Sequence, residues 1–521
     1  MAKYTPVIGM EIHVELKTKS KMFCACKNGL GLETEPNINI CPVCTAQPGT
    51  LPVPNAQAIE FVQLAGLALN CNLRLGSKFD RKNYFYPDIP KGYQISQYDQ
   101  PFCEAGHLDV LGPARNATPA RPSATIAIRA GSDAASSGEH SVAGGRKIGV
   151  TRIHLEEDTG KLVHPKGANY SLVDFNRAGV PLMELVTEPD IETAEEARVF
   201  CQKLQQICRY LKISDADMER GHMRCEVNLS LYKAGEEKLS GTKVEVKNIN
   251  SFKFVEKAIA YEIERQTEAL EKGEKIVQET RGWDSNRNMT ISQRKKESAH
   301  DYRYFPEPDI PPFEFTDGYV ENLKRKLPEL PDQKVKRFKE EYSLADDAIL
   351  VLTTDPALAD YFENVVSEIK EKIDCKEFSV PLEKCLALSA NYIVGELRKH
   401  LMTSGEGVDN LKITPENYAE LIAIIGEGKI SSSGAQTVLA EMYATGGDPS
   451  QIIEAKNLIQ MSDAGELEKI IDEVLTKNEK SVADFKAGKE NALKFLVGQV
   501  MKESQGKANP QVAEELLRKK L

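Results

Sequence analysis

The chain has 521 residues, of which 41% are hydrophobic and 28% are charged, and its formal net charge at pH 7 is −11. This length exceeds what one hydrophobic core supports and predicts roughly two to four domains of an ordinary globular protein. No apolar run approaches the ~20 residues that cross a bilayer, which excludes a transmembrane protein. The excess of acidic residues excludes a protein that binds nucleic acid over its whole surface.

The start of the chain, MAKYTPVIGMEIHVEL, has no apolar signal-peptide core, so we expect no export. The eleven cysteines are mostly scattered singly, which is a poor disulfide framework for so long a chain. We therefore expect a cytoplasmic protein with reduced thiols and no membrane contact.

The first three hundred residues contain segments with the two-residue period of β-strands. In residues 8–16 apolar residues alternate with Glu11, His13 and Glu15, and residues 225–232 and 243–247 repeat this pattern. Such one-sided strands predict an antiparallel sheet with one packed face and one polar face.

Helical segments interrupt these strands. Apolar residues recur at three- and four-residue spacing in 56–70, 193–211 and 251–273. Residues 111–147, rich in Ala, Ser, Gly and Pro, are expected to form a mobile excursion between two strands. The pattern predicts an α+β region.

The character of the chain changes after residue 305. The segment PEPDIPPFEF is typical of a proline-rich connector, and from about residue 331 the pattern is helical. Residues 404–410 predict a second linker, after which Thr414 and Pro415 begin a helix as N-cap and first residue. We therefore expect a first domain over 1–300, a connector over 301–330, and two all-α domains over 331–407 and 408–521.

The C-terminal end is locally basic. From residue 480 onward nine Lys or Arg residues stand against five Asp or Glu residues. This balance is compatible with contact to a polyanion, and equally with an exposed helix surface rich in lysine.

Four cysteines lie close together near the N-terminus, in CACKNGLGLETEPNINICPVC. The pairs Cys24–Cys26 and Cys41–Cys44 offer four soft ligands on two short loops, which suits a closed, structural zinc site. A redox centre would use only the second pair, and unrelated buried thiols are the third interpretation. We favour zinc bound by all four cysteines.

Polar residues on the predicted strands suggest a second metal site. Glu11 and His13 share one strand face, and Glu157 and Glu184 stand on the apolar sides of theirs. A carboxylate in such a position needs a cation or hydrogen bonds, and oxygen ligands from several strands are how proteins hold Mg²⁺ beside phosphates. Ordinary surface carboxylates on a sheet are the competing interpretation.

The segment RKNYFYPDIPKGYQISQYDQP (81–101) interleaves cationic residues with tyrosines and amides, as in functional loops on a rigid scaffold. An Ω-loop with a structural role would look similar. The chain contains neither G-x-x-x-x-G-K-[ST] nor G-x-G-x-x-G after a strand, so any use of ATP occurs without a P-loop.

These segments resemble the B subunit of the bacterial and organellar glutamyl-tRNA(Gln)/aspartyl-tRNA(Asn) amidotransferase, the GatB family. The matching blocks are VIGMEIHVELKTKSKMF, SKFDRKNYFYPD, YQISQYDQP, HLEEDTGK, YSLVDFNRAGVPLMELVTEPD, KNINSF, DYRYFPEPD and FLVGQVMKESQGKANP. They run in family order from residue 7 to about residue 510. The resemblance therefore covers nearly the whole chain.

The resemblance implies a ligase that forms a carbon–nitrogen bond with glutamine as the amide donor. Such a protein uses ATP and Mg²⁺ to phosphorylate the side chain of Glu on Glu-tRNA(Gln) or Asp on Asp-tRNA(Asn). Ammonia from a partner amidase, the A subunit, then displaces phosphate, and a small C subunit joins the two in a heterotrimer. The implied fold is a cradle like that of glutamine synthetase, followed by a helical domain and a tail domain that binds tRNA.

The resemblance also implies roles for particular residues. His13, Glu157 and Glu184 are expected to bind Mg²⁺ with Glu11 beside them, and Lys82 is expected at the site or the mouth of the ammonia tunnel. Substrate-binding positions are expected among Arg177, Arg224, Glu226 and Lys247, and the cysteine quartet matches a zinc site of some family members.

Two alternatives remain at this point. One is a tRNA-binding scaffold without catalytic function, against which the presence of Glu11, His13, Glu157 and Glu184 argues. The other is a component of the archaeal two-subunit Glu-tRNA(Gln) enzyme, against which the lack of a large inserted domain argues.

Overall fold

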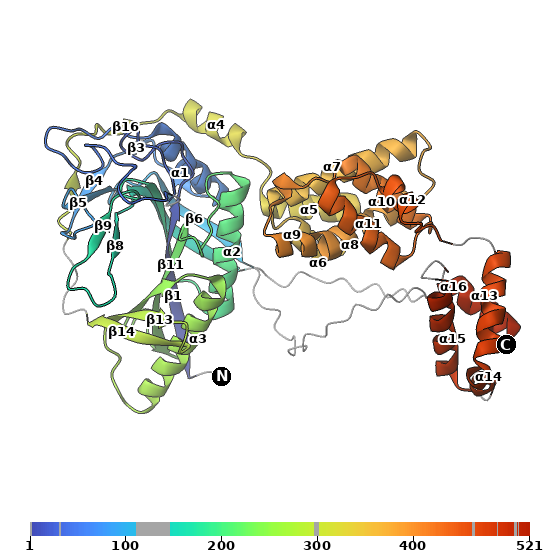
Figure 1. Cartoon of the computed structure of the whole chain (residues 1–521). Coiled ribbons are helices and arrows are strands. Elements are labelled where there is room, and N and C mark those ends of the chain that lie inside the picture. The colour runs from blue at the N-terminus through green and yellow to red at the C-terminus, as the bar shows by residue number, and fades with distance from the viewer. Residues whose placement is uncertain are drawn as a thin grey trace. The chain divides into compact units, whose positions relative to one another are not determined.

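The computed structural model describes residues 3–30, 33–110, 146–295, 302–460, 464–486, 488–504, 508 and 510–521. The chain divides into two compact units, residues 1–330 and 331–521 (Figure 1). Of the excursion predicted over 111–147, residues 111–145 lie outside the described residues and the last two residues begin strand β7. No helix within the described ranges is both long and apolar enough to cross a membrane.

The first unit is built on a nine-stranded sheet with the order β14-β13-β12-β11-β1-β10-β7-β6-β2. Its strands are β1 (Tyr4–Glu15), β2 (Asn72–Leu73), β6 (Cys103–Val110), β7 (Arg146–Glu157), β10 (Pro181–Thr187), β11 (Met223–Lys233), β12 (Val244–Ile249), β13 (Glu279–Asp284) and β14 (Met289–Lys295). Neighbouring strands are antiparallel except for β12 and β13, which run parallel. The predicted antiparallel sheet is therefore confirmed except for this one parallel pair, which makes the sheet mixed.

Three helices cover one face of this sheet, α1 (Ala56–Ala68), α2 (Ala194–Tyr210) and α3 (Phe252–Glu271) (Figure 1). Each begins where a side chain accepts hydrogen bonds from the first turn: Asn55 for α1, Thr193 for α2 and Ser251 for α3. Their apolar sides and the even-numbered residues of β1 form one continuous core. The opposite face of the central strands carries the polar residues of β1.

Short strands complete the first unit. They form the small sheets β15 (Phe305–Pro306)–β4 (Asp80–Asn83)–β5 (Tyr93–Ser96), β16 (Phe313–Glu314)–β3 (Gly76–Ser77) and β8 (Lys161–Val163)–β9 (Leu172–Asp174). Helix α4 (Asp317–Lys326) packs on α1, where Lys326 pairs with Glu60 at 2.8 Å. The predicted connector over 301–330 is therefore part of the first unit, because its described residues pair with and pack against earlier strands and helices.

The second unit is built from helices. They are α5 (Pro331–Tyr342), α6 (Asp346–Leu352), α7 (Pro356–Asp374), α8 (Leu382–Tyr392), the π-helix η1 (Ile393–Leu397), α9 (Arg398–Ser404), the 3₁₀ helix η2 (Val408–Asn410), α10 (Pro415–Gly426), α11 (Ser432–Thr445), α12 (Pro449–Ala455), α13 (Ala464–Lys477), α14 (Glu479–Lys486), α15 (Glu490–Glu503) and α16 (Pro510–Lys520). The predicted start of α10 is confirmed, with Thr414 as its N-cap and Pro415 in its first turn.

The hydrophobic cores do not follow the boundary predicted between 407 and 408. One core joins helices on both sides of it, and within this core the rings of Tyr361 (α7) and Tyr418 (α10) lie 5.8 Å apart. A second, smaller core begins at Leu467 and includes Leu517. Hydrophobic packing therefore continues across residues 408–410, and the division between the two cores lies after about residue 460.

Candidate active site

The polar face of the central strands brings four titratable side chains into one row. His13 on β1 pairs in register with Arg224 on β11 and Glu184 on β10, and Glu184 pairs with His154 on β7. Directly opposed residues of neighbouring strands present their side chains to the same face. Residues distant in the sequence therefore meet because the hydrogen-bonded register aligns them.

A histidine and two carboxylates from this region form a compact group. One ligand atom from each of His13, Glu156 and Glu184 lies within 4.8 Å of the others. His13 Nε2 is 3.3 Å from a Glu184 carboxylate oxygen and 3.9 Å from one of Glu156. Glu156 and Glu184 are only 2% and 7% exposed. Two buried carboxylates this close require a compensating cation, and their oxygens suit Mg²⁺ or Mn²⁺.

The histidines control the charge of this group. His154 Nε2 lies 3.2 Å from the same oxygen of Glu184 that faces His13. Burial alone would raise the pKa of Glu184, but His154 and His13 hold it well below its usual range. Burial lowers the pKa of His13, yet Glu184 and Glu156 outweigh it and raise this pKa to about 9. Glu184 is thus kept ionised, as a metal ligand must be.

Lys82 approaches the same group from β4. Its ammonium lies over the Tyr302 ring, 5.3 Å from the ring centre. Burial lowers the pKa of Lys82, but Glu156 and Glu184 outweigh burial and raise it. The predicted cation is therefore charged and interacts with the two carboxylates, so it can stabilise added negative charge at this group.

Glu11 belongs to a neighbouring acidic group. Glu11, Glu226 and Glu245 present oxygens within 4.8 Å of one another, on β1, β11 and β12. Lys247 lies 2.7 Å from Glu226 and 3.5 Å from Glu245. The described geometry groups Glu11 with two other carboxylates, and its place on the same ion as His13 and Glu184 stays a prediction. Lys247 and Glu226, predicted as substrate-binding residues, lie together beside it.

Arg224 and Arg177 lie beside a second buried pair of carboxyl groups, Asp158 and Glu15. Arg224 lies 2.8 Å from Asp158 and 3.3 Å from Glu15, and Arg177 lies 3.7 Å from Asp158. Burial and the neighbouring Asp158 raise the pKa of Glu15 to about 8, whereas the two arginines outweigh burial and lower the pKa of Asp158 to about 2. Glu15 therefore binds a proton more readily than Asp158, and both predicted arginines lie beside the His13 row.

Glu157 lies on the other face of β7, and its predicted role as a ligand beside His13 and Glu184 is wrong. Its oxygens are 2.5 and 2.6 Å from Lys91 Nζ, and one of them accepts a hydrogen bond from the backbone N–H of Ile95. The cause is strand alternation: consecutive residues of a strand point to opposite faces, so Glu156 takes the place beside His13.

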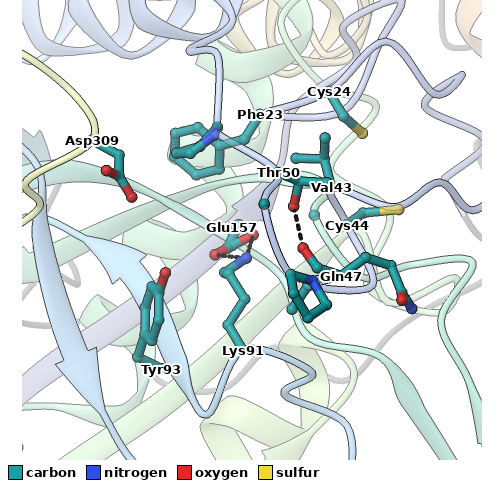
Figure 2. Close-up of a pocket in the computed structure, with 15 residues that line it drawn as sticks. Phe23, Cys24, Val43, Cys44, Gln47, Thr50, Lys91, Tyr93, Glu157 and Asp309 are labelled. Carbon is teal, nitrogen blue, oxygen red and sulfur yellow. Dashed lines mark hydrogen bonds and ion pairs between the residues drawn. The ribbon is translucent and has the colours of Figure 1, made fainter.

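The Lys91–Glu157 ion pair lines a cavity of about 260 Å³ near the cysteine loop (Figure 2). Phe23, Cys44 and Thr50 lie on another side of this cavity. Because Glu156 and Glu157 point to opposite faces of β7, this strand separates the ion pair from the group around His13.

The four cysteines of the N-terminal loops come together. One Sγ atom from each of Cys24, Cys26, Cys41 and Cys44 lies within 4.8 Å of the others. The thiol of Cys24 and the backbone N–H of Cys41 outweigh burial, and with Lys21 they lower the pKa of Cys44 to about 5. Four convergent thiols, one of them readily ionised, fit tetrahedral Zn²⁺ and exceed what a two-cysteine redox centre requires.

Three residues of this face were missed by the sequence-based interpretation: Glu156, His154 and Arg152. They alternate along β7 on the side opposite Ile153 and Leu155. The sequence H-L-E-E contained a signal for Glu156. Glu157 lies two residues after Leu155 and therefore points away from the polar face with it, which leaves Glu156 on the polar face. Nothing in the local sequence marked Arg152, which depends on the register between β7 and β10.

Comparisons with known proteins identify the family of the chain. A family model described as the GatB/GatE catalytic domain matches residues 6–321, and one described as the GatB domain matches residues 377–521. The B subunit of aspartyl/glutamyl-tRNA(Asn/Gln) amidotransferase is 45% identical to this chain in Thermotoga petrophila and in Carboxydothermus hydrogenoformans, and 46% identical in Dehalococcoides mccartyi. Each alignment covers 100% of this chain and 99% of the relative. The predicted resemblance is confirmed, and the chain belongs to the family of B subunits of aspartyl/glutamyl-tRNA(Asn/Gln) amidotransferases.

Proposed function

We propose that this chain carries out the ATP-dependent step of amidation on misacylated tRNA. The observation that carries the proposal is the group of His13, Glu156 and Glu184, whose two buried carboxylates interact electrostatically with Lys82. The relatives are named for Asp- and Glu-tRNA substrates and as one part of a larger enzyme. We accordingly propose Glu-tRNA(Gln) and Asp-tRNA(Asn) as substrates, and as partners an amidase, the A subunit, together with a small C subunit.

The reaction requires activation because a carboxylate is a poor acyl donor to ammonia. Phosphorylation by ATP supplies a leaving group, and catalysis of phosphoryl transfer depends on positioning and on charge stabilisation. Bound Mg²⁺ would neutralise phosphate charge during this transfer. His13, Glu156 and Glu184 would hold it; the ion would replace the proton of His13 and, with His154 beside Glu184, would keep this carboxylate ionised. Lys82 would place its ammonium against the charge that builds up on the transferred group.

The cavity beside Lys91 and Glu157 is the proposed route for ammonia. It lies on the opposite side of β7 from Glu156, so a small neutral molecule would pass one strand to reach the activated carboxyl group. The Lys91–Glu157 ion pair would act as the polar barrier on this route.

Other parts of the chain take supporting roles in this proposal. The nine-stranded sheet would form a cradle like that of glutamine synthetase, and a structural zinc ion on the cysteine quartet would brace one wall of the ammonia cavity. The C-terminal helical unit would contact tRNA. We also propose a cytoplasmic location, because none of the eleven cysteines forms a disulfide in the structure, as suits a reducing compartment.

The proposal is tested by product analysis. The chain, purified with its two partner subunits, is incubated with ATP, Mg²⁺ and ammonium and with Glu-tRNA(Gln) or Asp-tRNA(Asn), and the amino acid is then released from the tRNA and identified. We expect glutamine or asparagine from the native complex and none from the Glu156→Gln complex. Amidation that persists in the Glu156→Gln complex would assign the chain a scaffold role and refute the proposed catalytic group.

A further inference from the structure

We propose that the buried residue Lys21 balances the negative charge of a zinc ion held by the four cysteines, and that it fixes this metal site to the wall of the neighbouring cavity. A zinc ion with four thiolate ligands is an anion, because the thiolates carry more charge than the divalent ion neutralises. This inference rests on the zinc ion included in the proposed function and names the cation that such an anion requires.

Lys21 lies in the interior of the protein, although lysine side chains normally keep their ammonium group in water. Its exposed fraction is 1%. Lys334, the other buried lysine among the described residues, forms ion pairs with Asp360 and Glu363. Lys21 forms no ion pair with a carboxylate in the part of the chain that the structure describes. A buried charge without a counter-charge is strongly destabilising, so Lys21 requires an anion nearby.

The hydrogen bonds of Lys21 indicate where this anion lies. Its Nζ donates to the carbonyl oxygens of Asn39, at 2.9 Å, and Phe175, at 3.4 Å, and to Sγ of Cys44 at 3.8 Å. An ammonium group has three N–H donors, so each donor has one acceptor and the group is held in place. Two of these acceptors are neutral carbonyl groups. The sulfur of Cys44 is therefore the acceptor that can carry the missing negative charge.

Cys44 is the cysteine of the quartet that most needs such a partner. It is buried, whereas Cys24, Cys26 and Cys41 are partly exposed and can be solvated by water. Its Sγ also accepts a hydrogen bond from the backbone N–H of Cys41 at 3.2 Å. Groups that donate to metal ligands orient the ligands and strengthen metal binding. The buried cation thus lies beside the ligand whose charge water solvates least.

The alternatives for the cysteines leave the charge of Lys21 unbalanced. A neutral thiol at Cys44 would provide no counter-charge, and neither would a disulfide between Cys41 and Cys44. Four thiolates on zinc provide it, and the sulfur atoms of all four cysteines lie within reach of one ion. The position of Lys21 is therefore an observation in favour of zinc that is independent of the cysteines themselves.

Lys21 also connects the metal site to the cavity that contains the Lys91–Glu157 ion pair. Its acceptor Phe175 begins a short segment that ends at Gly179. A Cβ built at Gly179 would lie 3.6 Å from Cδ of Lys21 and 3.6 Å from Cβ of Cys44, so the backbone there packs on both side chains. Gly179, Cys44 and Glu157 all line the cavity. The stem of Lys21 thus lies between the metal site and the cavity wall.

A second contact joins the same two segments. The side chain of Asn176 accepts a hydrogen bond from the backbone N–H of Asn39 at 2.9 Å and donates to the carbonyl oxygen of Glu35 at 2.7 Å. The loop between the two cysteine pairs is therefore attached to residues 175–179 at both Lys21 and Asn176. Loss of the metal would release this wall as well as the loop.

The test uses two variants of Lys21 and a matched control. Lys21→Met keeps an unbranched side chain and removes the charge, and Lys21→Gln removes the charge but keeps N–H donors. Lys19→Met makes the same change of charge two positions away. Lys19 is exposed, and its side chain has no hydrogen bond or ion pair within the described ranges.

Zinc affinity of the full-length chain is measured by competition with a chromophoric chelator. We expect about tenfold weaker zinc binding in Lys21→Met and in Lys21→Gln, because both lose the charge beside Cys44. Lys19→Met should remain within about twofold of the native chain, since solvent screens an exposed charge. If Lys21→Met does not fold, the comparison rests on Lys21→Gln.

Hydrogen exchange in residues 20–53 separates charge balance from packing. With zinc bound, exchange should be faster in Lys21→Met than in the native chain. After chelation the native chain retains a buried cation without a counter-charge, so exchange in Lys21→Met should then be no faster than in the native chain. If the stem of Lys21 only filled space, its replacement would speed exchange in both states.

Zinc affinities equal to that of the native chain in both Lys21 variants would overturn the proposal, and so would faster exchange of Lys21→Met in both states. Normal zinc affinity in Lys21→Gln alone would assign the effect to hydrogen bonding and overturn the role of the charge. A native chain that binds no zinc would also overturn the proposal. Amidation that depends on charged tRNA would still be observed in that case if the proposed function holds, so the two failures are distinguishable.

Discussion

Two consecutive carboxylates, Glu156 and Glu157, show how a single position decides the chemistry. They differ only in the face of β7 to which they point, yet one joins His13 and Glu184 and the other pairs with Lys91 beside a cavity. Both are buried. Their partners distinguish them: Glu156 faces histidines and Lys82, whereas Glu157 is neutralised by an ion pair.

This difference predicts opposite outcomes for the same substitution. Glu156→Gln should weaken Mn²⁺ binding at least tenfold because it removes a charged ligand, whereas Glu157→Gln should leave Mn²⁺ binding within about twofold, since additivity holds for groups without shared partners. Electron paramagnetic resonance of free Mn²⁺ in a titration measures both. Equal losses in the two variants would contradict the assignment of their faces.

From the sequence we predicted His13, Glu184 and Lys82 for this site, but we predicted Glu157 where the structure has Glu156. The strand pattern contained the answer, since Glu157 aligns with the apolar residues Ile153 and Leu155. The grouping of Glu11 with Glu226 and Glu245 was not predictable, because it depends on the register of three strands and on a register shift between β11 and β12.

At the scale of elements, the cysteine loops have little regular structure of their own. Within the described residues 20–30 and 33–50 the chain forms turns and bends with one isolated bridge, Ser20 to Lys27. Few backbone hydrogen bonds hold such loops, so a metal ion would supply much of their rigidity.

We therefore predict that pure protein contains about one zinc per chain, and that the double change Cys41→Ser and Cys44→Ser removes it. Chelation should increase hydrogen exchange in residues 20–53 and leave that of α2 and α3 unchanged. Metal analysis and exchange mass spectrometry provide the two measurements. Protein that contains no zinc, or loops unaffected by its removal, would contradict the structural role.

Helices α5 and α7 are joined by an ion network around Lys334, which is 7% exposed and lies 2.9 Å from Asp360 and 3.1 Å from Glu363. Burial raises the pKa of Glu363, but Arg337 and Lys334 outweigh it and lower this pKa below its usual value. A carboxyl group whose pKa is lowered by folding stabilises the fold above its unfolded pKa, and this stabilisation is lost as pH falls through the folded value.

Glu363→Gln should therefore reduce the free energy of local unfolding of α5 and α7 by about 1 kcal/mol at pH 7. The difference from the native chain should shrink below the ordinary glutamate pKa of 4.5. Hydrogen exchange between pH 4 and 7 measures it, with Glu371→Gln as the control, because Glu371 is an exposed residue of α7 with no ion pair in the described structure. A pH-independent difference would rule out the charge of Glu363 as the cause.

At the scale of the molecule, the sequence predicted an α+β region followed by helices, which the structure confirms. From the sequence we placed one boundary near 300 and another near 408, whereas the compact units meet at 330/331 and the core that contains Tyr361 and Tyr418 continues to Ile453. Proline and glycine mark where elements end, but they do not show which helices share a core. That depends on contacts such as Tyr361 with Tyr418, which lie 57 positions apart in the chain (418 − 361).

The division after residue 460 defines a truncation that spares both larger cores. Removal of residues 461–521 takes away the small core from Leu467 to Leu517. We expect the shortened chain to bind misacylated tRNA at least tenfold more weakly and ADP with unchanged affinity, since contacts to separate units act independently. Filter binding and calorimetry test this. Unchanged tRNA binding would place the tRNA contact elsewhere.

The central claim is that His13, Glu156 and Glu184 hold the ion for phosphorylation of a tRNA-bound amino acid. The most direct measurement follows phosphate release from γ-labelled ATP by the complex with its partner subunits, with Mg²⁺ and ammonium present and glutamine omitted. We predict release that depends on Glu-tRNA(Gln) or Asp-tRNA(Asn), is lost in Glu156→Gln and persists in the control variant Gly76→Ala, in which the added Cβ meets nothing within 4 Å. Release that is independent of charged tRNA, or that survives Glu156→Gln, would contradict it.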